Sequence, residues 1–270
     1  MSKRLTLSKL PEGSRTRLFG RSIFFSKKVA STNEWAKKLA SQGAPEGWVV
    51  IAGTQTHGRG RLDHGWISPL GGLWFSLILR PNQRLAKAAR LTFVAGIAVA
   101  ETLHEQYGLR TQTMWPNDVL VNGRKICGIL GEASMMGKEV NTVILGIGIN
   151  ANFIAERVLP ESIRQKATSL QTELNRRIQL EELFIRLLEK LEATYAFYKR
   201  RGFISILKQW KRYAGFLGQN VEVTDRNEMI TGLAYDVDED GALILMLENG
   251  VFKHVFAGDV SLRTQWKPLT

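Results

Sequence analysis

The 270-residue sequence contains a single cysteine, Cys127, which excludes a disulfide bond within the chain and fits a reducing compartment. Long apolar runs are also absent. The longest, residues 93–100, is far shorter than the roughly 20 residues that a membrane-spanning helix needs, and no signal-peptide core precedes it. We therefore expect a cytoplasmic protein without a membrane span.

Acidic residues are scarce at the start of the chain, where Glu12 is the only one among the first 28 residues. This composition superficially resembles an organelle transit peptide, and we favour a frayed basic terminus instead. Residues 1–22 also have too few apolar positions for a separate domain. No DNA-reading module is expected there.

Signatures of nucleic-acid-binding modules are missing as well: no helix-turn-helix, zinc-finger or RNA-recognition pattern accompanies the basic residues. The net charge of +12 and the isoelectric point near 10.0 nevertheless suit an anionic partner. Nucleic acid, an acidic protein or a phosphate-bearing substrate would each fit. Because the lysines and arginines are spread along the chain, charge alone does not decide between them.

What the sequence does contain predicts an α+β fold with one substantial core and a smaller second domain. Apolar runs predict strands over residues 48–52, 73–79 and 143–150, and apolar spacing predicts helices over 85–107 and around 180–191. From residue 214 the pattern changes to short strands separated by turns. These are expected over residues 221–223, 231–235, 243–247 and 252–256. They predict a small β-barrel over residues 214–270.

The stretch from Gln55 to Gly72, which we call the glycine loop, has the composition of an anion-binding loop. Gly58 and Gly60 allow backbone angles at which consecutive N–H groups turn toward one bound oxygen. Arg59 and Arg61 alternate with them and add two permanent positive charges. A solvated Gly/Arg surface loop explains the same pattern, because short glycine motifs are common.

A strand around Phe24 and Phe25 leads into Ser31-Thr32-Asn33-Glu34, which predicts a helix N-terminus. Ser31 and Glu34 have the spacing of a capping box, which accounts for both without a ligand. Hydroxyl and amide groups at this position could also recognise a polar ligand ring. The two interpretations are compatible, because different atoms can serve each purpose.

Trp115-Pro116-Asn117-Asp118 precedes a predicted hairpin whose turn is Asn122-Gly123. Pro116 cannot donate a backbone hydrogen bond, so Asn117 and Asp118 are expected at a strand entrance, within reach of a ligand or metal. The same residues also compose an ordinary turn.

Glycines recur in the strands that follow. Gly128 comes three residues after Lys125, and Gly146 and Gly148 share one face of the next strand. Glycine weakens a strand, so we expect something other than side chains to fill the space above them. Close packing of a helix onto the sheet is the alternative.

Taken in order, these motifs resemble those of biotin protein ligases. The matching residues are Ser31-Thr32-Asn33, Gln55, Gly58-Arg59-Gly60-Arg61, Trp66, Trp115-Pro116-Asn117-Asp118, Lys125-Ile126-Cys127-Gly128 and Gly146-Ile147-Gly148-Ile149-Asn150. The match spans roughly residues 20–265, and linked motifs in order are far more specific than any single one. Residues 167–170 also resemble a strand-edge signal of that family.

The resemblance implies a class II synthetase-like mixed-sheet catalytic domain over residues 23–213, with an SH3-like barrel over residues 214–270. It implies that biotin and ATP form biotinyl-5′-AMP and pyrophosphate, and that a lysine of a biotin carboxyl carrier protein then takes the biotin. Mg²⁺ is the expected metal ion. We favour a homodimer formed through the sheet, and the short N-terminal segment predicts a ligase without specific DNA binding.

The resemblance assigns a role to each motif residue. Arg59, Arg61 and Lys125 are expected to neutralise the reacting anions. The expected biotin contacts are Ser31, Thr32, Asn33, Gln55, Gly58, Arg59, Gly60, Arg61, Lys125 and Gly128. The expected ATP contacts are Arg61, Trp66, Asn117, Asp118, Lys125 and Asn150, with Trp66 stacked on adenine and Asp118 as the magnesium ligand.

Two positions depart from the family pattern: Met114 stands where relatives commonly have lysine, and His64 where they often carry a further basic residue. The loss of fixed charge puts ATP affinity in doubt rather than the reaction class. We expect Cys127 to be buried and inert. We predict no structural metal, because His57 and His64 lack further ligands nearby.

Two other classes of protein remain as rivals. A lipoate ligase shares the general fold but is not expected to combine this glycine loop with the Trp-Pro-Asn-Asp hairpin. A nucleic-acid-binding module would use the basic surface and the small barrel and leave the pocket empty.

Overall fold

The computed structural model describes residues 14–62, 64–81, 83–84, 89–136, 139–225 and 228–262. Its main part is a mixed sheet of eight strands in the order β1-β2-β3-β8-β7-β6-β5, with β4 paired to β8. The strands are β1 Ile23–Ser26, β2 Val49–Ala52, β3 Leu73–Leu79, β4 Gln83–Arg84, β5 Thr111–Met114, β6 Asp118–Val121, β7 Arg124–Met136 and β8 Glu139–Ile149. Among the described strands of this sheet, only β1 and β2 pair in parallel, and the remaining ladders are antiparallel.

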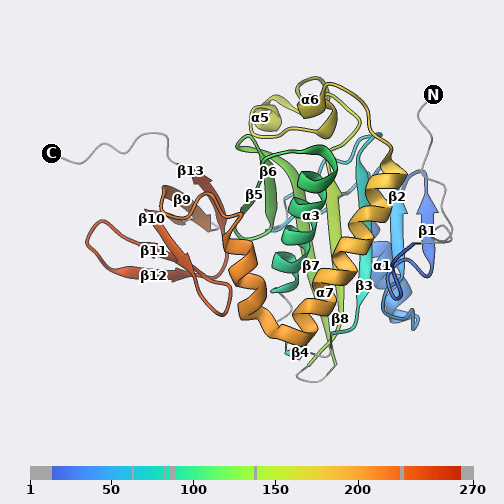
Figure 1. Ribbon diagram of the computed structural model, residues 1–270, viewed down its shortest axis with the longest axis horizontal. Helices are drawn as coiled ribbons and strands as arrows, with labels where there is room; N and C mark the ends of the chain where they lie inside the picture. The colour runs from blue at the N-terminus through green and yellow to red at the C-terminus, as the bar shows by residue number, and fades with distance from the viewer. Residues whose placement is uncertain are drawn as a thin grey trace.

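Helices cover both faces of this sheet (Figure 1). The helices α3 Leu91–Tyr107 and α7 Leu180–Lys211 pack against each other on one face, where Phe184 of α7 also contacts Phe75 of β3. The helix α1 Thr32–Ser41 packs on β2, β3 and β8. Successive residues of a strand point to opposite faces. Accordingly, Val49 and Ile51 belong to the core under α3 and α7, whereas Val50, Ile78 and Ile144 pack with α1 on the other face.

Most expected elements are present, with changed bounds. The predicted helix over 85–107 begins at Leu91; residues 85–88 lie outside the described part of the chain, and Ala89 and Arg90 form a turn. Gly202, with φ 74°, interrupts α7, so this long helix changes direction there. Three short helices follow β8: α4 Ala155–Val158, α5 Glu161–Arg164 and α6 Leu170–Leu174. No helix among the described residues is long and apolar enough to cross a membrane.

The segment before β1 is held in place, so the expectation of a frayed terminus is wrong for residues 15–20. The Glu192 carboxylate on α7 accepts hydrogen bonds from three successive backbone N–H groups, at 2.7 Å from Arg17, 2.9 Å from Leu18 and 2.7 Å from Phe19. Phe19 is only 2% exposed and contacts the ring of Tyr195. Phe19 therefore anchors this segment in the main core.

The second sheet contains five antiparallel strands in the order β12-β11-β10-β9-β13, seen beside the large sheet in Figure 1. They are β9 Asn220–Asp225, β10 Glu228–Val237, β11 Leu243–Met246, β12 Phe252–Val255 and β13 Asp259–Leu262. Four of them were predicted, and the α+β class with a small SH3-like barrel is confirmed. The turn before β11 contacts the connection between β5 and β6 and the start of α3, because Trp115 Nε1 donates to Gly241 O at 2.9 Å and Arg90 pairs with Asp240 at 2.6 Å.

Candidate active site

The glycine loop folds back on itself as an irregular hairpin. Gln55 bridges to Ser68, and Arg59 to Gly65. The N–H of Gly60 donates to His64 O at 2.7 Å, so the expectation that successive N–H groups turn toward one bound oxygen is wrong for this group. Neither Gly58 nor Gly60 has a positive φ. Gly58 is required by close packing instead, because a Cβ there would lie 2.2 Å from Trp66 O.

The polar residues at the start of α1 form a chain of hydrogen bonds with the loop and with β3. Gln55 Oε1 accepts from the backbone N–H of Thr32 at 2.7 Å and from Thr32 Oγ1 at 3.0 Å, and Gln55 Nε2 donates to Ser68 Oγ at 2.8 Å. Ser76 Oγ lies 2.7 Å from Thr32 Oγ1 and 2.6 Å from Asn33 Oδ1. Three expected biotin contacts, Thr32, Asn33 and Gln55, thus form a row of hydroxyl and amide groups with Ser68 and Ser76, and all five except the half-buried Gln55 are buried.

Ser31 caps α1 as predicted, with its Oγ 3.5 Å from the N–H of Glu34. The reciprocal bond of a capping box is absent from the hydrogen bonds of the described residues, because the Glu34 carboxylate pairs with Arg59 and Lys37. The helix N-terminus therefore explains Ser31, whereas Glu34 serves an ion-pair network.

Glycines line the face of β7 and β8 that carries α1. Gly128 on β7 pairs with Gly148 on β8, and Gly146 lies two residues before Gly148. A Cβ at Gly146 would lie 2.1 Å from Asn33 Oδ1, and one at Gly148 would lie 2.5 Å from Trp66 Nε1. The expectation that something other than side chains fills this space is wrong: Asn33 and Trp66 fill it, and at Gly146 the alternative of a closely packed helix is right.

Lys125 and Asp118 form an ion pair beside Trp66. Lys125 Nζ lies 2.6 Å from Asp118 Oδ2 and 5.2 Å from the centre of the Trp66 ring. Burial raises the pKa of the Asp118 carboxyl above its ordinary value, and the neighbouring ammonium of Lys125 opposes that shift. Asp118 Oδ1 and Trp66 Nε1 are buried without a hydrogen-bond partner among the described residues. Unpartnered buried polar atoms are rare and commonly mark a ligand position.

The unpartnered Asp118 oxygen fits the expected magnesium ion. Mg²⁺ is usually held by one or two carboxylates and by substrate phosphates rather than by an all-protein cage. The described residues contain no group of three or more His, Cys, Asp or Glu that could hold a metal by itself. Asp118 would thus hold the ion only together with the nucleotide.

The two arginines of the loop contact different walls of the site. Arg59 pairs with Glu34 on α1 and lies 3.5 Å from Glu132 on β7. Arg61 donates to Gly258 O at 3.1 Å and lies 3.9 Å from Asp259, at the start of β13. The glycine loop therefore touches both the large and the small sheet. A cavity of about 760 Å³ opens beside it, lined by the loop and by Val158.

Asn117 and Asn150, expected near the nucleotide, use their amide groups within the protein. Asn117 Nδ2 donates to Ile129 O at 2.6 Å, and Asn150 Nδ2 donates to Thr168 O at 2.9 Å. Both interactions stabilise the strands that carry Lys125, whose backbone bridges to Ala167. The structure therefore gives each asparagine a positioning contact.

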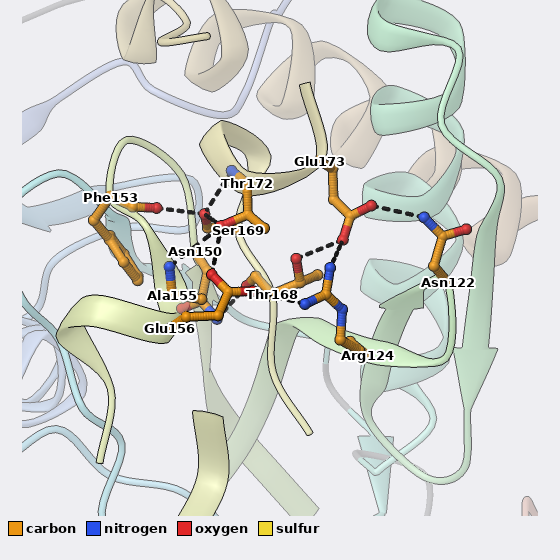
Figure 2. A network of polar contacts seen from close by, with 10 residues as sticks. All are labelled: Asn122, Arg124, Asn150, Phe153, Ala155, Glu156, Thr168, Ser169, Thr172 and Glu173. Atoms are coloured by element: carbon orange, nitrogen blue, oxygen red, sulfur yellow. Dashed lines mark hydrogen bonds and ion pairs between the residues drawn. The ribbon is translucent and has the colours of Figure 1, made fainter. Parts of the chain in front are cut away.

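A polar network holds the turn of the hairpin formed by β6 and β7 (Figure 2). Glu173 on α6 accepts from Asn122 at 2.7 Å and pairs with Arg124 at 2.8 Å. Arg124 also pairs with Glu156 on α4 at 2.7 Å. Because Arg124 immediately precedes Lys125, this network holds the start of β7 in place.

Three residues at the site were missed from the sequence: Ser76, Glu132 and Asp259. Ser76 could have been found, because it is a single hydroxyl within the apolar run of β3. Glu132 and Asp259 carry no local signal, since their partners lie far away in the chain.

The two departures from the family pattern have different surroundings. Met114 is 7% exposed and belongs to the main core. His64 is exposed, and its Nδ1 lies 3.7 Å from Asp259. Cys127 is fully buried as predicted, and burial raises the pKa of its thiol. This environment makes the thiol a poor nucleophile.

Known proteins match this chain over most of its length. The family described as Biotin/lipoate A/B protein ligase matches residues 25–150, and the Biotin protein ligase C terminal domain matches residues 216–263. The bifunctional ligase/repressor BirA of Bacillus subtilis is 36% identical over 260 residues, which cover 96% of this chain and 79% of that protein. The biotin–[acetyl-CoA-carboxylase] ligase of Paracoccus denitrificans is 35% identical, covering 80% of this chain and 90% of its own.

Solved structures show the same family likeness in the fold. The biotin protein ligase of Aquifex aeolicus in complex with biotin and ATP superposes with a TM-score of 0.76 at 31% identity, covering 89% of this chain and 98% of that one. The sequence and the fold thus point the same way, and the chain belongs to the biotin protein ligase family.

Proposed function

We propose that this chain activates biotin with ATP to biotinyl-5′-AMP and pyrophosphate, and then transfers biotin to a lysine of a biotin carboxyl carrier protein. The observation that carries the proposal is the continuous face of β7 and β8. It holds the amide of Asn33 above Gly146, the ring of Trp66 above Gly148 and Gly128, and the end of the Lys125 side chain next to Gly128. Uncharged polar groups thereby adjoin a cationic one, as recognition of biotin and of the phosphate of ATP requires.

In the first step a biotin carboxylate oxygen attacks the α-phosphorus, and the bond from that phosphorus to pyrophosphate breaks. Both reactants are anions, so neutralisation of charge is the main catalytic demand. Arg61 and Lys125 supply fixed positive charge. A magnesium ion held by Asp118 and the nucleotide would add further positive charge to the triphosphate.

In the second step the lysine amine of the carrier attacks the acyl carbon of biotinyl-5′-AMP, and AMP leaves. The anhydride is already activated, so a covalent intermediate with the protein is unnecessary. The buried Cys127 thiol accordingly has no part in the reaction. Thr32, Gln55 and Asn33 would contact the ureido ring of biotin by exchanging hydrogen bonds that they now make with one another.

The remaining assignments rest on the sequence and on the family. We propose that the carrier belongs to a biotin-dependent carboxylase, which fits the positive net charge if the carrier surface is acidic. The division into residues 1–22, 23–213 and 214–270, a homodimer through the sheet, a cytoplasmic location and the lack of specific DNA binding stay predictions.

Pyrophosphate release in the presence of ATP, Mg²⁺ and either biotin or lipoate tests the function. We expect release with biotin and little with lipoate, followed by biotin transfer when a carrier domain is added. Release with lipoate alone would identify a lipoate ligase. The absence of release with both substrates would contradict an adenylating enzyme.

A further inference from the structure

Arg59 belongs to a network of four alternating charges on the α1 face of the large sheet. Its Nη1 pairs with Glu34 Oε1, and its Nη2 lies 3.5 Å from Glu132 Oε1. Lys37, one turn further along α1, contacts the same two carboxylates at 3.3 Å and 2.7 Å. One guanidinium thus connects the loop to helix α1 and to strand β7.

Glu34 and Glu132 are suited to hold that guanidinium. The pKa of Glu34 is lowered, chiefly by the hydrogen bond from Lys37 and also by Arg59, so the carboxylate is charged at neutral pH. Glu132 is 17% exposed at its side chain and also accepts from Asn33 Nδ2 at 2.7 Å. Glu132 therefore joins the ion pairs to the polar row at the start of α1.

Glu132 lies on the same face of β7 as Gly128, the face over which the glycine loop lies. Glu132 pairs with Ile144, Leu130 with Gly146 and Gly128 with Gly148. These three residues of β7 alternate with residues on the other face, so they share the α1 face of the sheet. Trp66 lies over the Gly128 end of this row, and Arg59 is held at the Glu132 end. The glycine loop is therefore attached at both ends of the row.

We propose, building on the proposed function, that Glu34 and Glu132 are positioning residues that hold Arg59, and through it the glycine loop, closed over biotinyl-5′-AMP. An acyl phosphate anhydride hydrolyses if it escapes into water before the carrier lysine arrives. A closed loop keeps it bound between the two steps. Arg59 thereby acts on retention of the intermediate, instead of on the phosphate charge as the sequence suggested.

Release of a preformed intermediate separates retention from catalysis. The enzyme is loaded with labelled biotin and ATP, freed of excess label, and chased with unlabelled biotinyl-5′-AMP. We expect Glu34→Gln to release label about 2- to 5-fold faster, the range that one partly exposed ion pair supplies. Its single-turnover rate of pyrophosphate formation should stay at the wild-type value. Glu34→Asp, which keeps the charge, should restore part of the retention.

A double-mutant cycle tests whether Glu34 acts through Arg59. The variant Glu34→Gln with Arg59→Gln should release label no faster than Arg59→Gln alone, because one interaction is lost in both. Glu161→Gln is the matched control: Glu161 also lies in the first turn of a helix and pairs with a cation three residues later, but on α5. It should behave as wild type.

Additive effects in the cycle, or unchanged release from Glu34→Gln, would overturn the proposal. So would an Arg59→Gln variant that slows pyrophosphate formation and leaves release unchanged, since Arg59 would then act on phosphate. Failure of the proposed function gives a different result in the loading step, because the wild-type protein would then form no adenylate.

Discussion

Lys125 Nζ lies 2.6 Å from one oxygen of Asp118, while the other oxygen of that carboxylate is buried without a hydrogen-bond partner among the described residues. A half-satisfied buried carboxylate is costly to the folded state, and its retention indicates a task that outweighs stability.

The Asp118→Asn variant should be inactive in adenylation and more stable than the wild type at neutral pH. Burial raises the pKa of Asp118 in the folded protein above its value in the unfolded chain. The contribution of protonated Asp118 to the free energy of unfolding is therefore lost as the pH rises through the folded pKa. The variant does not titrate there and escapes this loss. Melting curves from pH 4 to pH 8 should show an advantage that grows with pH.

Asp236→Asn is the matched control, because Asp236 also pairs with a lysine, Lys211, at 2.6 Å but belongs to the small sheet. Its melting temperature should equal or fall below that of the wild type. A lower melting temperature for Asp118→Asn at every pH would contradict the prediction.

Arg61→Ala should slow adenylate formation by about 10²- to 10³-fold while the protein stays folded, as expected for a fixed donor to a developing charge. Single-turnover pyrophosphate formation and circular dichroism measure the two effects. Comparison with Arg59→Gln is informative, because that substitution should change release of the intermediate rather than its formation. Near-normal turnover of Arg61→Ala would exclude its assigned role.

Gly146→Ala should destabilise the protein by about 1–3 kcal/mol, the usual cost of overpacking. Its Cβ would lie 2.1 Å from Asn33 Oδ1 and displace the amide from Ser76 and Glu132. Biotin affinity should fall with it. Gly131→Ala on β7 is the control, since its Cβ would meet Thr92 at 3.4 Å. Chemical denaturation should show it close to the wild type.

Cys127 should resist alkylation in the native protein and react once the protein is unfolded. Its side chain is fully buried, and burial raises the pKa of the thiol. Cys127→Ala should retain both half-reactions, which biotin transfer to a carrier domain measures. Rapid alkylation of the native protein with loss of activity would show that the thiol is accessible and needed.

Glu192→Ala should lower the free energy of unfolding by about 2 kcal/mol, because three backbone N–H groups lose one charged acceptor. Glu189 accepts from one backbone N–H of this segment, that of Arg15. Glu189→Ala should therefore lower the free energy of unfolding much less. Equal losses for the two variants would mean that the segment before β1 is not held through Glu192.

Local signals predicted a hairpin turn and a helix cap correctly, because one or two residues dictate the backbone shape there, but they failed at Gly58 and Gly60, which have no positive φ. Asn122 and Gly123 both have positive φ in the hairpin turn, and Ser31 caps α1. The start of α3 was misplaced because Arg90, which precedes Leu91, makes no side-chain cap. The strand β13 was missed because it is short and mostly exposed.

The site was predictable in its residues and less so in their contacts. Gly146 and Gly148 reveal in sequence that a side chain is missing, but not that Asn33 and Trp66 occupy the space. The partners of Arg59 and Arg61 come from α1, β7 and β13, and such distant pairings leave no local pattern. Only tertiary structure separates the tasks of two arginines that look equivalent in sequence.

Gly60 alone separates Arg59, attached to α1 and β7, from Arg61, attached to the turn before β13. Three residues span at most about 10 Å of chain, so the backbone between them has little slack. The loop is therefore a mechanical link between the two sheets. A shift of the small sheet would therefore displace the part of the loop that lies over Gly128 and Gly148. A ligand that replaces Asp259 as the partner of Arg61 would weaken this connection between the two sheets.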